Sequence, residues 1–204
     1  MYMFKDPAPL TRAATIALWV YMVLNALTAL GTLYLLPVGL ELETPAGYAI
    51  TLLAIGALLA MIACFILVGC WIYRANANAH SFSDYMSISP GGAVGWYFVP
   101  ILNLFKPFQA MKETWLASHY PGNWHSEPAP SIVSWWWGLW IVTNILGGLS
   151  LRMSASAPDS ANQFIVIVDV ISAALNVPLC LVLIAMMKGI AAAQDATHHS
   201  EAFA

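Results

Sequence analysis

The sequence predicts an all-α membrane protein: one helical domain of 204 residues with four transmembrane helices, a re-entrant proline-broken segment and an interfacial amphipathic helix. The first supporting observation is composition. Hydrophobic residues make up 60% of the chain, charged residues 8%, and the mean hydropathy is +0.73, whereas about a quarter of the residues of soluble proteins are charged. The second is a set of four apolar stretches, each long enough to cross a bilayer. The third is residues 89–118, which are apolar for too short a distance to cross and are interrupted by Pro100, Asn103 and the Lys106-Pro107 pair.

The first two spans lie in the N-terminal part of the chain. Residues 12–36 stay apolar for about 24 residues, which is enough to span with some tilt. After a short polar loop, residues 46–73 form the second span, and the polar stretch 74–89 predicts a loop behind it. Small residues recur in the second span at four-residue spacing and indicate a face that another helix approaches closely. They are Gly56, Ala60 and Cys64.

Two further spans, residues 131–151 and 162–188, lie in the C-terminal part and are followed by a polar tail. Four tryptophans open the third span, and indoles collect at the level of the lipid headgroups. The cluster therefore indicates one membrane interface and a packing surface for the amphipathic helix. Its members are Trp135, Trp136, Trp137 and Trp140. All three cysteines fall within apolar stretches, so we expect buried thiols rather than a disulfide framework.

The segment 89–118 is expected to dip into the membrane and return to the same side. A bilayer supplies no water for the backbone groups that Pro100 leaves free, so irregular backbone survives there only when protein surrounds it or a wet cavity lines it. Pro107 suits the first turn of a new helix. Apolar and polar residues then alternate at helical spacing, which predicts an amphipathic helix along the membrane surface. The apolar face carries Phe108, Met111 and Trp115, and the polar face Gln109, Lys112 and Glu113.

The distribution of lysine and arginine favours re-entry of residues 93–108 over a fifth crossing. With four spans, six cations share one side of the membrane and one lies opposite; with five spans the division is four against three. Cytoplasmic loops carry an excess of lysine and arginine, so we expect both termini and the re-entrant segment on the cytoplasmic side. The six are Lys5, Arg12, Arg74, Lys106, Lys112 and Lys188, and the seventh is Arg152.

Several polar side chains are expected at membrane depth. Asn25, Asn144 and Asn176 each lie 13 or 14 residues into a predicted span, about 20 Å along the helix. Asp169 lies two turns before Asn176 on the same face. The asparagines either hold helices together or line a polar path. Asp169 requires either a proton or hydrogen-bond donors, for which the candidates are Ser172, Tyr21 and Thr28.

A quarter of the chain resembles a family of bacterial integral-membrane proteins known only as a domain of unknown function. The resemblance rests on a W-x-x-R-x-x-x-N stretch at Trp71, Arg74 and Asn78, on SPGGAVGWYFVPILNLFKPFQ at residues 89–109, and on a W-x-A-S ending at residues 115–118. It implies a protein of the bacterial inner membrane and brings no known activity.

The sequence carries no motif for catalysis, a metal, a cofactor or nucleic acid. The five histidines fall outside the predicted spans, so paired haem ligands within the bundle are missing. No protease or esterase motif and no glycine-rich phosphate loop is present. We therefore expect a protein that is not an enzyme.

Two functions fit these features. In the first, the chain is a binding or assembly protein whose aromatic, re-entrant cytoplasmic half docks a membrane lipid, a hydrophobic small molecule or a partner subunit, within a homo-oligomer or a larger membrane complex. In the alternative, it is a small oligomeric transporter or channel with a polar path through Asn103, Asn176 and Asp169. The candidate ligand or path residues are Trp96, Pro100, Asn103, Gln109, Trp115, Arg74, Asn78, Asp169, Asn176, Asn25 and Asn144.

Overall fold

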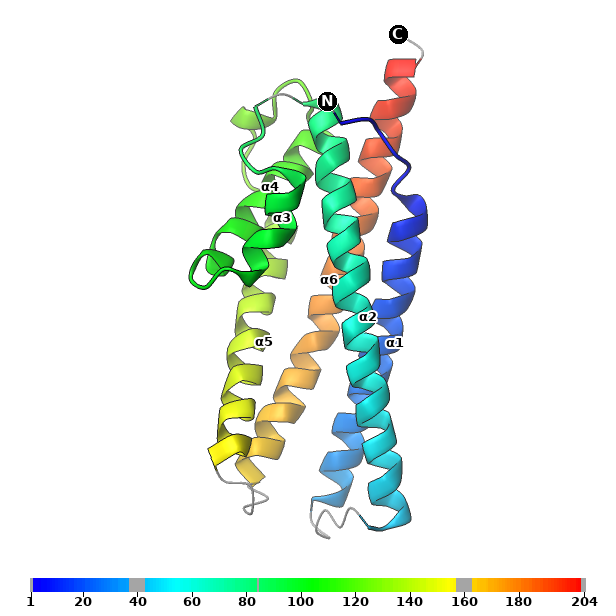
Figure 1. Cartoon of the computed structure of the whole chain (residues 1–204), viewed down its shortest axis with the longest axis vertical. Helices are drawn as coiled ribbons and strands as arrows, with labels where there is room; N and C mark the ends of the chain where they lie inside the picture. The colour runs from blue at the N-terminus through cyan, green and yellow to red at the C-terminus, as the bar shows by residue number, and fades with distance from the viewer. Residues whose placement is uncertain (1, 37–42, 84, 157–162, 203–204) are drawn as a thin grey trace. The chain divides into compact units, whose positions relative to one another are not determined.

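The computed structural model describes residues 2–36, 43–83, 85–156 and 163–202. Four long helices dominate it: α1 (Ala8–Leu35), α2 (Pro45–Phe82), α5 (Ser131–Ser156) and α6 (Gln163–Ala202) (Figure 1). Each is long and apolar enough to cross a membrane, and the described residues contain no strand. The prediction of an all-α chain with four candidate spans is therefore confirmed.

Between α2 and α5 the chain folds into short helical pieces, none of which has the length of a span. They are α3 (Pro90–Gly95), the 3₁₀ turns η1 (Trp96–Phe98) and η2 (Leu102–Leu104), α4 (Lys106–His119) and η3 (Trp124–Ser126). Ser89 caps α3 by accepting a hydrogen bond from the Gly92 N–H at 3.2 Å, and Pro107 lies in the first turn of α4 as expected.

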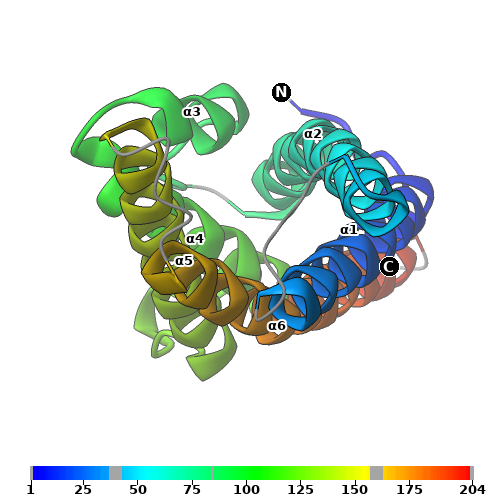
Figure 2. The same cartoon turned by 90° about the horizontal axis from the view of Figure 1, so that it is seen from below.

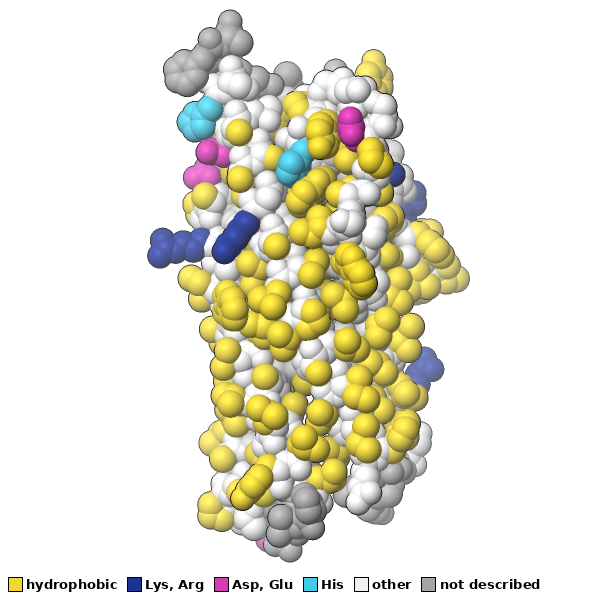
Figure 3. All heavy atoms as spheres, turned by 180° about the vertical axis from the view of Figure 1, so that it is seen from behind, with side chains coloured by type: hydrophobic (Ala, Val, Ile, Leu, Met, Phe, Trp, Pro, Cys, Tyr) yellow, Lys and Arg dark blue, Asp and Glu magenta, His cyan; other side chains and the backbone are white. Residues whose placement is uncertain are grey.

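The chain divides into two compact units. Unit 1 consists of Met1–Thr15, Phe65–Trp137 and Val182–Ala204, and unit 2 of Ile16–Cys64 and Gly138–Leu181. Unit 1 contains both ends of the chain and all six cations expected to share one side of the membrane, whereas Arg152 belongs to unit 2. On the face drawn in Figure 3, hydrophobic side chains cover most of the helix surface and charged side chains are few.

In unit 2, the small-residue stripe of α2 is a packing face, as predicted. A methyl group built on Gly56 would lie 3.5 Å from Leu24 of α1, and both Ala60 and Cys64 are buried. In unit 1, α4 lies beside the first turns of α5 (Figures 1 and 2), where Phe108 and Trp137 have ring centroids 6.4 Å apart. The tryptophan cluster thus packs against α4 as expected.

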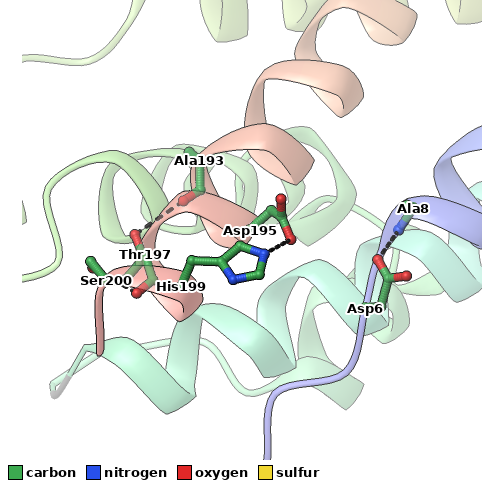
Figure 4. A network of polar contacts seen from close by, with 7 residues as sticks. All are labelled: Asp6, Ala8, Ala193, Asp195, Thr197, His199 and Ser200. Carbon is green, nitrogen blue, oxygen red and sulfur yellow. Dashed lines mark hydrogen bonds and ion pairs between the residues drawn. The ribbon is translucent and has the colours of Figure 1, made fainter. Parts of the chain in front are cut away.

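Two helices run further than the sequence predicted. The stretch 74–89 was expected to be a loop, but α2 continues to Phe82, because Asn76 and Asn78 are fully buried and find partners in unit 1. The tail after residue 188 continues α6 to Ala202. Near that end, His199 Nε2 lies 3.5 Å from Asp195 Oδ1, as Figure 4 shows.

The cysteines agree with the prediction only in part. Cys64 and Cys180 are buried free thiols, but Cys70 is exposed on the surface of α2. Cys70 belongs to a helix that is long and apolar enough to cross a membrane, and its thiol lies on the surface of that helix and not in the protein core.

Candidate functional site

A cluster of buried polar side chains ties together the elements of unit 1, and Asn78 is at its centre. The Asn78 amide pairs with both backbone groups of Lys5: the Lys5 N–H donates to Oδ1 at 3.0 Å, and Nδ2 donates to the Lys5 carbonyl at 2.8 Å. Nδ2 also donates to Gln194 Oε1 at 3.0 Å. Asn78 therefore joins α2 to the N-terminal segment and to α6.

Gln194 and Asn76 extend this amide cluster to α4. Gln194 Nε2 donates to the Ala75 carbonyl at 2.7 Å and to Ser118 Oγ at 3.0 Å. Asn76 Nδ2 donates to Thr114 Oγ1 at 2.9 Å, while its buried Oδ1 has no partner among the described residues. Buried polar groups are rarely left unpaired, and this cluster satisfies nearly all of its own. We assign Asn78 to holding the fold rather than to a ligand.

A second polar group surrounds Glu113, which is only 7% exposed. Its carboxylate accepts hydrogen bonds from the Ser87 N–H at 3.0 Å, the Ile88 N–H at 3.3 Å, Gln109 Nε2 at 3.0 Å and the Ser87 hydroxyl. Glu113 therefore fastens the segment before α3 onto α4. The sequence placed Glu113 on a polar, exposed face of α4; the structure buries it, because residues 85–88 fold over that face.

A pocket of about 330 Å³ opens beside this carboxylate. Gln109, a predicted site residue, lies in its wall, and Lys106 Nζ donates to Gln109 Oε1 at 3.1 Å from one turn earlier on α4. The remaining polar lining comes from three short segments of unit 1. It consists of Ser87, Lys112, Glu113, His125 and Glu127. Tyr85, Leu116 and Trp124 complete the wall, so the pocket has aromatic and apolar lining beside its polar groups.

The connection between η1 and η2 forms an exposed apolar tip. Phe98 is 82% exposed, Ile101 73% and Phe105 64%, and Leu104 is exposed as well. Pro100 lies exposed within this tip, whereas Asn103 is half-buried in η2. We call Phe98, Ile101, Leu104 and Phe105 the hairpin tip.

Ile101 gives the hairpin tip a strained backbone. Its φ of 68° and ψ of −49° close a tight turn in which the Leu102 N–H donates to the Pro100 carbonyl at 2.8 Å. This is the rare form of the three-residue turn, and a β-branched residue at positive φ is an outlier.

The other aromatic candidates serve mainly in packing. Trp115 stacks on His119 with ring centroids 4.3 Å apart and lies against Gly189 of α6, where a methyl group would approach its ring to 3.0 Å. Trp96 is half-buried at the end of α3. Arg74 is half-buried on α2.

The predicted residues at membrane depth all belong to unit 2, and Asp169 is exposed on α6. Its donor is the Ser150 hydroxyl of α5, not Ser172, Tyr21 or Thr28 as we had expected. Thr28 donates instead to the Leu24 carbonyl of its own helix.

Within the part of the chain that the structure describes, the three asparagines predicted at membrane depth form no hydrogen bond to another helix. Asn144 Nδ2 donates to the Trp140 carbonyl and Asn176 Nδ2 to the Ser172 carbonyl, each within its own helix. Asn25 Oδ1 is buried without a partner among the described residues. Asn103, which was expected to share a polar path with Asn176 and Asp169, belongs to unit 1.

Sequence reasoning missed Glu113, Ser87, Gln194 and Asn76 as organising residues. The family motifs could have pointed to the surroundings of Gln194, because Asn78 and Ser118 both occur in them and both form hydrogen bonds with Gln194. Gln194 itself follows the last predicted span and carries no local signal.

The described residues are mostly helical, and four of their helices are long and apolar enough to cross a membrane, which is typical of an all-helical membrane protein. A family model described as a domain of unknown function, DUF4328, matches residues 43–192, and the chain belongs to this family. A search of curated proteins and a search of solved structures each gave no significant match.

Proposed function

We propose that this chain is a non-enzymatic protein of the bacterial inner membrane that binds lipid through the hairpin tip. Both termini and unit 1 face the cytoplasm, and residues 89–118 re-enter the inner leaflet. The grouping of six cations in unit 1 supports this orientation, since basic residues accumulate on the cytoplasmic side.

The observation that carries the proposal is the exposed, strained hairpin tip. A backbone strain like that at Ile101 costs about 1–3 kcal/mol, and glycine would avoid it. Transfer of an exposed isoleucine side chain from water into an apolar environment is favourable by about 1.5–3 kcal/mol of free energy. Lipid therefore offsets the strain, whereas water does not. Contiguous exposed apolar surface of this kind marks a site of membrane or protein interaction.

The tip also has the composition of a segment that enters a leaflet from the surface. Phe98, Ile101 and Phe105 are apolar and exposed, and Lys106 follows immediately at the start of α4. Its ammonium group donates to Gln109 Oε1 at 3.1 Å, so the charge is held on α4 while the lysine stem adjoins the apolar residues. A partner subunit is the competing occupant of the same surface.

Photo-crosslinking separates these two occupants. With p-benzoylphenylalanine in place of Phe98, irradiation of whole cells is expected to give adducts whose added mass is that of a phospholipid, because the tip lies among acyl chains. The same amino acid in place of Tyr120, which is exposed at the end of α4, controls for exposure alone. A protein adduct at position 98, or phospholipid adducts in equal yield at position 120, contradicts the proposal.

A further inference from the structure

We propose that the polar pocket beside α4 binds the headgroup of a zwitterionic phospholipid, in which Lys112 pairs with the phosphate and Glu127 with a primary ammonium group. This inference rests on the proposed lipid binding at the hairpin tip and specifies the class of lipid.

The pocket walls carry charges of opposite sign that do not neutralise each other. Lys112 and Glu127 both line the pocket, yet they form no salt bridge with each other, and neither side chain has a hydrogen-bond partner among the residues that the structure describes. Both are half-buried. Separated charges at the wall of one pocket are complementary to a ligand that carries both signs.

The third charged wall residue, Glu113, is not free to bind a ligand. Two backbone N–H groups, one hydroxyl and one amide already donate to its two oxygens. A carboxylate offers about four acceptor positions, so those of Glu113 are filled. Its role is to position Ser87 and Gln109 in the wall, which leaves Lys112 and Glu127 to face the ligand.

Glu127 is held in place by its neighbours. Trp124 is buried against Ala79, Leu116 and Ala117, and His125 stacks on the Trp124 ring with centroids 3.8 Å apart. The Glu127 N–H donates to the Trp124 carbonyl at 3.4 Å. The segment that carries the acidic group is thus anchored to the core of unit 1.

The position of the pocket on α4 fits an amphiphile. Phe105 of the hairpin tip directly precedes α4, and Lys112 follows it by seven residues, or about 10 Å along the helix at 1.5 Å per residue. An apolar tip and a charged pocket therefore lie two helical turns apart on one element. The nearer cation, Lys106, is already bonded to Gln109.

Among common bacterial headgroups, phosphoethanolamine matches both charges. Phosphatidylglycerol offers Lys112 a phosphate but gives Glu127 no cation. Phosphatidylcholine carries a quaternary ammonium that has no N–H to donate, so it forms no charge-assisted hydrogen bond with Glu127.

Native mass spectrometry of the full chain in detergent tests this assignment. We add phosphatidylethanolamine, phosphatidylglycerol and phosphatidylcholine with identical acyl chains in equal amounts. The ethanolamine lipid is expected to bind about tenfold more tightly than the other two, the effect of one charge-assisted hydrogen bond. Equal binding of all three lipids overturns the inference.

Variants assign the preference to the pocket. Lys112→Gln is expected to weaken binding of all three lipids by about tenfold, because each carries the phosphate. Glu127→Gln is expected to remove only the preference for phosphatidylethanolamine. Lys188→Gln, an exposed lysine of α6 outside the pocket, is the control and leaves lipid binding unchanged. A preference that survives both pocket substitutions overturns the inference.

Two further results separate this site from its alternatives. Glycerophosphoethanolamine, which has the headgroup without acyl chains, is expected to compete only weakly. Competition equal to that of the whole lipid would overturn the lipid assignment in favour of a soluble ligand. Lipid adducts at position 98 without headgroup preference would refute this inference while leaving the proposed function intact.

Discussion

Replacing Asn78 with alanine is expected to lower the free energy of unfolding by about 3 kcal/mol, because each buried group left without a partner costs about 1–3 kcal/mol. The substitution removes the partner of the buried Gln194 Oε1 and, at once, the partners of the partly buried Lys5 N–H and carbonyl. The N-terminal segment then keeps only its other contacts with α2, among them the ring contact of Phe4 with Phe82. The measurement is the midpoint of unfolding in a dodecylsulfate titration, followed by tryptophan fluorescence.

Asn144→Ala is the matched control for this change. Asn144 is exposed, and its amide donates only to the Trp140 carbonyl of its own helix. Its removal is expected to change the unfolding free energy by less than about 0.5 kcal/mol. Similar midpoints for the two variants would refute the central place of Asn78 in unit 1.

Replacing Glu113 with alanine is expected to lower the free energy of unfolding by about 4 kcal/mol, because the Ser87 and Ile88 N–H groups and the Ser87 hydroxyl lose their acceptor and each loss costs about 1–3 kcal/mol. Gln109 Nε2 keeps Ser87 Oγ as an acceptor. Residues 85–88 should then separate from α4. Hydrogen exchange should show this directly. The Ser87 and Ile88 N–H groups, which both donate a hydrogen bond to Glu113 in the folded chain, should exchange faster in the variant.

Glu127→Ala controls for the loss of a pocket carboxylate. Glu127 lines the same pocket and has no side-chain partner among the described residues. We expect unchanged exchange at Ser87 and Ile88 and an unfolding free energy within about 0.5 kcal/mol of the parent. If Glu127→Ala destabilises as much as Glu113→Ala, the hydrogen bonds to Glu113 do not hold this segment.

The spans were predictable because the bilayer imposes a length and a composition on any helix that crosses it. The short pieces at 89–118 were also foreseeable, since Pro100 and Pro107 interrupt the helical pattern locally. The ends of α2 and α6 were not. The polar residues at these two ends predict a loop and a tail. Both ends are helical because Asn78 and Gln194, which are 116 residues apart, are buried together and form a hydrogen bond.

The same limit applies to the candidate site. Gln109 was predicted, but Glu113 was assigned to an exposed face of α4 from its helical spacing. Its burial depends on Ser87 and Ile88, which are 25 or 26 residues earlier in the chain and fold over α4. Helical periodicity describes one helix at a time, so it cannot report a segment that arrives from elsewhere in the sequence.

The central claim is that residues 89–118 lie on the cytoplasmic side and re-enter the leaflet. Its most direct test is the labelling of Lys112→Cys by a membrane-impermeant maleimide, after Cys64, Cys70 and Cys180 have been replaced by serine. Arg152→Cys serves as the marker for the opposite side. We predict that Lys112→Cys is labelled only in inside-out vesicles and Arg152→Cys only in intact spheroplasts. Labelling of Lys112→Cys from outside the cell would contradict both the orientation and the proposed site.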